Sequence, residues 1–216
     1  MQVPLVLPFK VCMIFGCPDR DLFTACIKDA RNIGYSKFNA LYLNSKVSGN
    51  IIYRSENIPD KALPNFTVHL GYTPKDPEEG SFVVTKKWAI ACSGKVRYIG
   101  EDNSKDDGGN IFTWALDSFE SKIPLAGHKE MLALQSTFNR MQGSFSCWLY
   151  HFPTKQIYIY RCGAPLYYNT ECHEFCSVKS KDDFALKSGT LYKYKLRSIE
   201  PFLKVNVKED PLSILE

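Results

Sequence analysis

The sequence predicts an α+β protein built as a layered sandwich. The order of the expected elements is the main observation. A strand and a helix open the chain, more strands follow, then two helices, and finally a run of strands joined by short turns. The chain has 216 residues, enough for one large domain whose hydrophobic core can stabilise the fold without disulfides or a structural metal ion. Its 44% hydrophobic and 23% charged residues are typical of a globular protein.

The first part of the chain is predicted to form a strand followed by an amphipathic helix. Residues 9–16 are mostly apolar and indicate a strand. Pro18 and Asp19 are typical of a helix start, and Gly34 is typical of a helix end. The spacing of apolar residues predicts the buried face of this helix as Leu22, Phe23, Cys26, Ile27 and Ala30.

Strands and polar segments then alternate up to residue 94. Apolar runs predict strands over 38–43, 66–72 and 87–94, the last of them stopping at Gly94. The segments between them are rich in Pro, Asn, Ser or acidic residues. We therefore expect surface loops over 48–65 and 73–80.

The remaining chain predicts two helices and then a strand-rich half. A polar turn over 101–110 precedes a helix over 111–120 and a second helix over 128–141. One face of the first helix is expected to carry Ile111, Trp114, Ala115 and Ser118. Strands are predicted over 144–151, 156–161, 165–169, 173–178 and 190–196, whereas the tail, 197–216, is weakly patterned.

Composition and charge argue against two classes of partner. The net charge of +4 is spread along the chain without a dense Lys/Arg block, which argues against nucleic acid. No apolar run approaches the roughly 20 residues that a membrane helix needs. The start, "MQVPLVLPFKVCMIFG", has no positive n-region, is interrupted by prolines and lacks a small-residue cleavage site. We therefore expect a cytoplasmic protein without a membrane partner.

The eight cysteines are expected to be free thiols. An even number would suggest disulfides in a secreted chain, but no secretion signal accompanies it here. The stretch "ECHEFC" suggests a metal site at Cys172, His173 and Cys176. In a strand, however, His173 would point away from the two cysteines, and no CxxC pair elsewhere completes a tetrahedral set. We therefore expect neither a metal nor an organic cofactor.

Residues 141–180 carry the most specific pattern. The stretch "MQGSFSCWLYHFPTKQIYIYRCGAPLYYNTECHEFCSVKS" contains Gly-Ser-Phe at 143–145, a strand ending in Arg161, "GAPLYY" at 163–168 and "FCS" at 175–177. It resembles the second half of a class II glutamine amidotransferase domain. This is the glutaminase module of asparagine synthetase, amidophosphoribosyltransferase and glucosamine-6-phosphate synthase.

The first half of the chain resembles the same family in shorter stretches. These are "CMIFGC", "IGYSKFNA", "TVHLGYTP" and "WAIACSGKV", and "KSGTLYKY" resembles the strand that closes the domain. Together the resemblance covers about residues 12–196, leaving 197–216 as a C-terminal extension. It implies the αββα four-layer sandwich of the N-terminal nucleophile (Ntn) hydrolases, with two mostly antiparallel sheets.

The resemblance implies a nucleophile at Cys12. In that family the catalytic cysteine is the first residue of the mature chain, and its own α-amino group is the general base. Residues 1–11 would then be a leader or propeptide that is removed autocatalytically. The backbone amide of Gly94, assisted by the Ser93 hydroxyl, would stabilise the oxyanion.

The implied reaction is hydrolysis of a glutamine side-chain amide or a related amide. Tyr72, Thr73 and Asp107 fall where the family binds its substrate. We expect a stand-alone module that needs no cofactor and passes ammonia to a separate synthetase partner.

Several positions depart from the family pattern. Ser93 replaces the asparagine of the oxyanion hole, and Met13 replaces the glycine after the nucleophile. Gly71 falls where an arginine grips the glutamine carboxylate, and Ile33 falls where a second arginine lies near the nucleophile. The family aspartate falls near Gly108, so Asp106 or Asp107 would replace it after a small shift in register.

These departures leave two interpretations open. The protein is either an amidohydrolase with an altered substrate clamp, or a catalytically degenerate Ntn-fold protein that acts as a binding or regulatory module. In the second case Cys12 is a buried strand thiol, since free cysteine is among the most buried residue types. His69 and Arg161 fit structural roles better than catalytic ones, and Tyr72 and Thr73 fit packing as well as binding.

Overall fold

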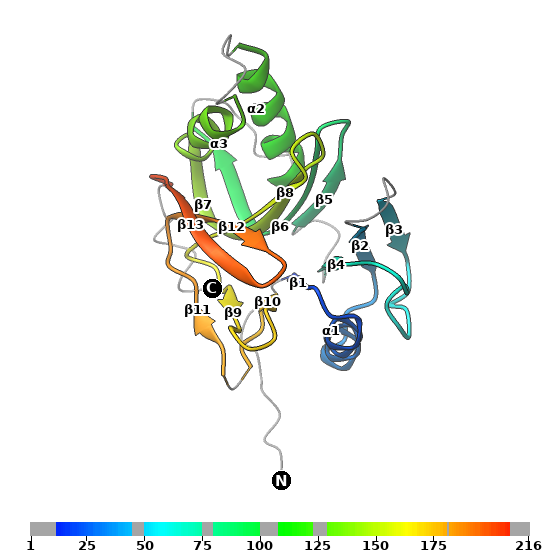
Figure 1. The fold of residues 1–216 in the computed structure, drawn as a ribbon. Helices are drawn as coiled ribbons and strands as arrows, with labels where there is room; N and C mark the ends of the chain where they lie inside the picture. Colours follow the sequence, from blue (N-terminus) through cyan, green and yellow to red (C-terminus); the bar gives the residue numbers. More distant parts are fainter. Residues whose placement is uncertain are drawn as a thin grey trace.

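The computed structural model describes residues 12–44, 50–74, 80–99, 108–122, 129–180 and 182–207. Two antiparallel sheets stack face to face, and helices cover their outer faces (Figure 1). This is the α+β, αββα sandwich with two antiparallel sheets that the sequence and the resemblance predicted.

The first sheet contains the start of the described chain. Its strand order is β11-β9-β10-β1-β4-β2-β3, and every neighbouring pair is antiparallel. The helix on its outer face is α1 (Arg20–Ile33). Its strands are β1 (Met13–Cys17), β2 (Phe38–Leu43), β3 (Ile51–Ser55), β4 (Val68–Thr73), β9 (Tyr167–Tyr168), β10 (Phe175–Cys176) and β11 (Phe184–Ala185).

The second sheet is formed by the middle and the end of the chain, in the order β13-β12-β8-β7-β6-β5. Two helices, α2 (Gly108–Lys122) and α3 (Lys129–Phe138), cover its outer face. Its strands are β5 (Gly80–Val84), β6 (Trp88–Tyr98), β7 (Met141–His151), β8 (Gln156–Cys162), β12 (Thr190–Lys195) and β13 (Ser198–Lys204).

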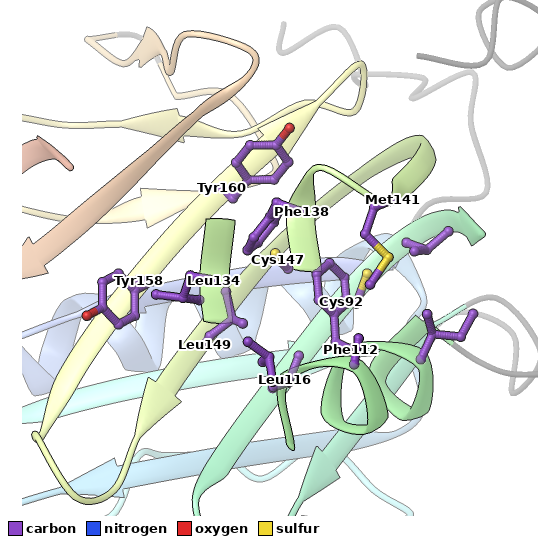
Figure 2. Packing of buried hydrophobic residues seen from close by; sticks show 14 of the residues in the cluster. Cys92, Phe112, Leu116, Leu134, Phe138, Met141, Cys147, Leu149, Tyr158 and Tyr160 are labelled. Carbon is purple, nitrogen blue, oxygen red and sulfur yellow. The ribbon is translucent and has the colours of Figure 1, made fainter. Parts of the chain in front are cut away.

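Three apolar clusters separate the four layers. One lies between the sheets and includes Ile14, Leu70 and Trp148. A second packs α1 against the first sheet. The third packs α2 and α3 against the second sheet, where Phe112 and Phe138 lie against Cys147 and Tyr160 (Figure 2). Because side chains alternate along each strand, residues of one parity face the inter-sheet core and the others face a helix.

The ends of α1 follow the sequence prediction. The Asp19 carboxylate accepts hydrogen bonds from the backbone N–H groups of Asp21 and Leu22, at 2.8 and 2.9 Å. Gly34 ends the helix in the left-handed conformation, with φ of 98°. Four of the five predicted apolar positions are buried, and Leu22 is partly buried.

The four edge strands were not predicted. β3 lies inside the expected loop over 48–65, β5 begins at the end of the expected loop over 73–80, β11 lies between the strands expected over 173–178 and 190–196, and β13 lies in the tail. An edge strand pairs on one side only, so it can be polar or short and still satisfy its backbone. In β3, for example, Ile51 and Ile52 are exposed and Arg54 lies over the Phe82 ring of β5.

Other boundaries also differ from the prediction. β6 does not stop at Gly94 but continues to Tyr98, paired with β7 throughout. α2 starts at Gly108, within the expected polar turn, and buries Ile111, Phe112, Ala115 and Leu116. Trp114, expected on the apolar face, is 47% exposed. Phe112 and Leu116, one turn apart, fix the buried side instead.

Three expectations concern segments that the structure leaves undescribed. The predicted leader, 1–11, most of the polar turn and the candidate Asp107 lie outside the described residues. Within the described part of the chain, no helix has the length and apolar character needed to cross a membrane.

Candidate functional site

Cys12 lies immediately before β1, where the two sheets meet. Its side chain is 1% exposed and belongs to the cluster between the sheets. The Tyr72 hydroxyl on β4 donates to the Cys12 Sγ at 3.6 Å. Cys12 and Tyr72, two of the predicted site residues, are therefore brought together.

Two serines hold the backbone at the start of β1. The Ser93 hydroxyl, on β6 of the opposite sheet, donates to the carbonyl oxygen of Cys12 at 2.7 Å. The Ser177 hydroxyl accepts from the backbone N–H of Ile14 at 3.1 Å, and its own N–H donates to the Ile14 carbonyl at 2.9 Å. These contacts fix the main chain directly after the Cys12 side chain. They also direct the proton of Ser93 to the main chain rather than to an open pocket.

Gly94 follows Ser93 and has a backbone that other residues rarely adopt. Its φ is 104°, and an added Cβ would lie 2.3 Å from the Ser144 carbonyl oxygen on β7. Glycine is therefore required for β6 to continue past this point. Gly94 directly follows Ser93, whose hydroxyl contacts Cys12, so the Gly94 amide is one residue along the chain from that contact.

Tyr72 and Thr73 point to opposite sides of β4. Tyr72 belongs to the inter-sheet cluster, as Cys12 does. Thr73 is the register partner of Met13, which packs on the α1 side. Thr73 is fully buried and its hydroxyl has no hydrogen-bond partner. The alternation of the strand thus separates these two candidate substrate residues.

The position of the expected arginine clamp does not face Cys12. An added Cβ at Gly71 would lie 2.5 Å from the ring of Phe15, on the α1 side of the sheet. An arginine at this position of the backbone would therefore not reach the cysteine. Ile33, the position of the second expected arginine, ends α1 and is 37% exposed.

Tyr35 is a neighbour of the site that sequence reasoning missed. Burial, followed by the nearby Cys12 and Cys176 thiols, raises the pKa of Tyr35 to about 12. The residue lies just after α1, in the stretch "IGYSKFNA". The signal that could have found it was its place in that stretch, two residues after the position of the absent arginine.

His69 has the structural role that its strand position favoured. Its ring packs against Phe23 and Tyr42, at centroid distances of 5.1 and 5.5 Å, on the α1 side of β4. Burial lowers the pKa of His69 below its usual value. This face of the strand is opposite the one that carries Tyr72.

The eight cysteines are free thiols in the structure. The Cys26 thiol donates to the Glu174 carboxylate at 2.7 Å, next to Cys176. Among the described residues, no group of three or more Cys, His, Asp or Glu side chains is arranged to hold a metal ion.

Comparison with known proteins shows what this fold resembles. No protein-family model matches the sequence, and no curated protein matches it. Two similar solved structures are a glutamine phosphoribosylpyrophosphate (PRPP) amidotransferase from B. subtilis complexed with ADP and GMP, and a protein described as the allosteric regulatory enzyme of purine biosynthesis. Each superposes with a TM-score of 0.57, at 6% and 8% sequence identity.

The matches cover most of this chain but only part of each relative. They span 88% and 91% of this chain, and 48% and 49% of the two solved chains. The chain therefore spans about half the length of the structures it matches. At such low identity the likeness shows the fold alone, and the chain has the Ntn-type sandwich fold of the glutamine amidotransferase structures.

Proposed function

We propose that this protein is an amidohydrolase of the class II glutamine amidotransferase type, with Cys12 as its nucleophile. The observation that carries the proposal is the position of Cys12. Its thiol lies immediately before β1, between the two sheets of an amidotransferase-like sandwich, with its backbone held by Ser93 and a hydroxyl donated by Tyr72.

The proposed mechanism needs Cys12 to be the first residue of the mature chain. Its free α-amino group then accepts the thiol proton, which is an easy transfer because an ordinary thiol and amine have pKa values of about 8.5 and 8. The thiolate attacks the amide carbonyl of a glutamine-like side chain. The C–N bond breaks, ammonia leaves with the transferred proton, and water hydrolyses the thioester to a carboxylate.

The neighbouring groups divide the remaining tasks. The Gly94 amide is the proposed oxyanion donor. Ser93 is a positioning residue, because its hydroxyl holds the Cys12 carbonyl, which remains after residues 1–11 are removed. Tyr72 lines the pocket beside the thiol. Asp107 is proposed to bind the substrate ammonium group.

The proposal extends to where the reaction takes place and what uses its product. Free thiols at all eight cysteines fit a reducing compartment, and we propose the cytoplasm. The released ammonia would pass to a partner protein with synthetase activity.

Intact mass and N-terminal sequencing test the proposal directly. We expect purified wild-type protein to begin at Cys12 and a Cys12→Ala variant to keep residues 1–11. The processed protein should release ammonia from L-glutamine, and the variant should not. A wild-type protein that keeps its leader would exclude this mechanism for that material, since a blocked amine cannot act as the base.

Two observations favour a second function, a non-catalytic binding module on the same fold. Gly71 packs under Phe15, where the family arginine would grip substrate, and the Ser93 proton is directed to the main chain. In that case wild type and Cys12→Ala would have the same N-terminus and neither would release ammonia.

A further inference from the structure

The inner face of the second sheet changes character beside Cys12. Along β6, β7 and β8 the residues facing the first sheet are apolar as far as Ala91, Trp148 and Ile159. Beyond them the same face becomes polar and basic. We call this surface the basic shelf, and its described side chains are Lys95, Arg97, Gln142, Ser144 and Arg161.

The alternation of the strands places these side chains on the inner face. Val96 and Tyr98 on β6, Phe145 on β7 and Cys162 on β8 all pack in the cluster under α2 and α3. Their neighbours in sequence therefore face the other way. Lys95 and Arg97 are exposed, and Arg161 is partly buried, so the shelf is open to solvent at one end.

A single row of the sheet connects the shelf with Cys12. Ser93 on β6 pairs with Ser146 on β7, and Ser146 pairs with Arg161 on β8. Ser93 itself donates to the Cys12 carbonyl. Two strand spacings, roughly 10 Å, separate Ser93 from Arg161, a gap that an arginine side chain can largely bridge.

Polar atoms of this row lack partners. The Arg161 Nε and the Ser146 hydroxyl are both buried, and neither makes a hydrogen bond. Buried polar groups in folded proteins are nearly always hydrogen-bonded, so exceptions need an explanation. A bound ligand that accepts hydrogen bonds from both groups would explain why they have no partner within the protein.

Among the residues that the structure describes, the shelf carries three cations, Lys95, Arg97 and Arg161, and no carboxylate. A cationic surface of this kind favours an anionic ligand, and a guanidinium can bind a carboxylate through two parallel hydrogen bonds. The position that binds the carboxylate in the related family is Gly71 here and is filled by the ring of Phe15. The shelf therefore offers a carboxylate site on the opposite sheet.

We infer that Arg161 is the carboxylate-binding, specificity-determining residue of this site. The basic shelf holds the anionic end of an amide substrate while its amide carbon meets Cys12. This inference rests on the proposed amidohydrolase function and assigns the residue that holds the carboxylate of its substrate.

Kinetics with a charged and a neutral substrate test the assignment. The wild-type protein, Arg161→Gln, Arg161→Lys and the control Lys28→Gln are compared on L-glutamine and L-glutaminol, in which an alcohol replaces the carboxylate. Lys28 is an exposed cation on α1, which covers the outer face of the first sheet. We expect Arg161→Gln to raise KM for glutamine about 10- to 100-fold with little change in kcat, since a charge-assisted hydrogen bond is lost.

Glutaminol separates recognition from a general structural defect. Its kcat/KM should be low in the wild type and unchanged by Arg161→Gln. Arg161→Lys should restore part of the affinity for glutamine, and Lys28→Gln should leave it unchanged. Equal use of both substrates by the wild type, with no effect of Arg161→Gln, would overturn the inference and leave the amidohydrolase proposal standing.

Binding of L-glutamate, measured calorimetrically on the same purified proteins, tests the shelf without catalysis. Binding that Arg161→Gln abolishes and Arg161→Lys partly restores supports the shelf even if no protein releases ammonia, in which case only the proposed function fails. Absence of L-glutamate binding to the wild type contradicts the inference. If Arg161→Gln does not fold, judged by its thermal transition, Arg161→Lys carries both comparisons.

Discussion

At the scale of single residues, Ser93 and Ser146 form a natural matched pair. They are register partners on β6 and β7 and both are fully buried. The Ser93 hydroxyl donates to the Cys12 carbonyl, whereas the Ser146 hydroxyl has no partner. The two residues thus differ in hydrogen bonding while sharing type and burial.

We predict that Ser93→Ala lowers the free energy of unfolding by about 1–3 kcal/mol, because it removes the partner of a buried carbonyl. Ser146→Ala should change it little or raise it, because it removes an unpaired buried hydroxyl. Urea denaturation of the two variants measures the difference. Equal losses would show that the Ser93 contact contributes nothing specific.

The sequence could predict part of the candidate site at this scale. Cys12, Tyr72 and Ser93 were named from local motifs, and the structure brings them together. Ser177 belongs to the quoted stretch "FCS" but was not named as a site residue, because its contact with Ile14 joins residues 163 positions apart. Thr73 was named beside Tyr72, yet strand alternation turns it to the other face. Local motifs do not specify such long-range contacts or the side of a strand that lines a pocket.

At the scale of elements, the sequence predicted central strands better than edge strands. β2 has the predicted bounds because it is apolar and buried along most of its length. β3 was missed because its exposed isoleucines lie among Asn, Ser and Pro. A strand that pairs on one side and faces solvent does not need the apolar pattern from which strands are predicted.

The continuation of β6 depends on a glycine that the sequence suggested as its end. Gly94 and Gly34 both have positive φ, at 104° and 98°. An added Cβ at Gly94 would meet the Ser144 carbonyl at 2.3 Å, whereas nothing lies within 4 Å of one at Gly34. The two positions therefore separate backbone strain from steric conflict.

We predict that Gly34→Ala lowers the free energy of unfolding by about 1–2 kcal/mol through backbone strain alone. Gly94→Ala should cost more than about 3 kcal/mol, because a clash with a neighbouring strand adds to the strain. Thermal or chemical unfolding of both variants is the measurement. A smaller loss for Gly94→Ala than for Gly34→Ala would contradict the described path of β6.

A partly buried carboxylate connects α3 to the second sheet. The Glu130 carboxylate accepts hydrogen bonds from Tyr158 at 2.6 Å and Thr154 at 2.8 Å, and lies 3.2 Å from His151 Nδ1. Burial alone would raise the pKa of Glu130, but the hydrogen bonds from His151, Tyr158 and Thr154 outweigh it and lower the pKa. The ionised form is therefore the one that stabilises the fold.

A lowered folded-state pKa makes this contribution pH-dependent. It is complete above the ordinary glutamate value of 4.5 and is lost as the pH falls through the lower folded value. We predict that Glu130→Gln is less stable than wild type near pH 7 and that the gap narrows below about pH 4.5. Unfolding free energies across this range, with Glu200→Gln as an exposed control, measure it. A gap that widens on acidification would contradict the assigned direction.

At the scale of the whole molecule, the relation between the two sheets positions Cys12. Its thiol contacts Tyr72 of the first sheet, and its carbonyl contacts Ser93 of the second. A change in the spacing of the sheets would therefore separate the cysteine from one of these partners. The order of elements predicted the layers, but not which residues join them, because such contacts come from complementary shapes across the core.

Trp148 makes one of these contacts between the two sheets. Its indole lies in the inter-sheet core, and Nε1 donates to the Gly71 carbonyl of the opposite sheet at 3.1 Å. We predict that Trp148→Phe lowers the free energy of unfolding by about 1–3 kcal/mol, because it removes this bond and leaves a small void. Trp114→Phe is the matched control, since Trp114 is 47% exposed on α2, and it should stay within about 0.5 kcal/mol of wild type.

The same two variants test whether the Trp148 contact between the sheets influences the proposed active site. If the spacing of the sheets positions Cys12, Trp148→Phe should also slow ammonia release from L-glutamine, although the tryptophan hydrogen bond goes to Gly71 and not to Cys12. Trp114→Phe should leave the rate unchanged. Activity measured well below the thermal transition of each variant separates misplacement of Cys12 from simple unfolding. A fully active Trp148→Phe protein would show that the contacts of Tyr72 and Ser93 position the cysteine without the Trp148 hydrogen bond between the sheets.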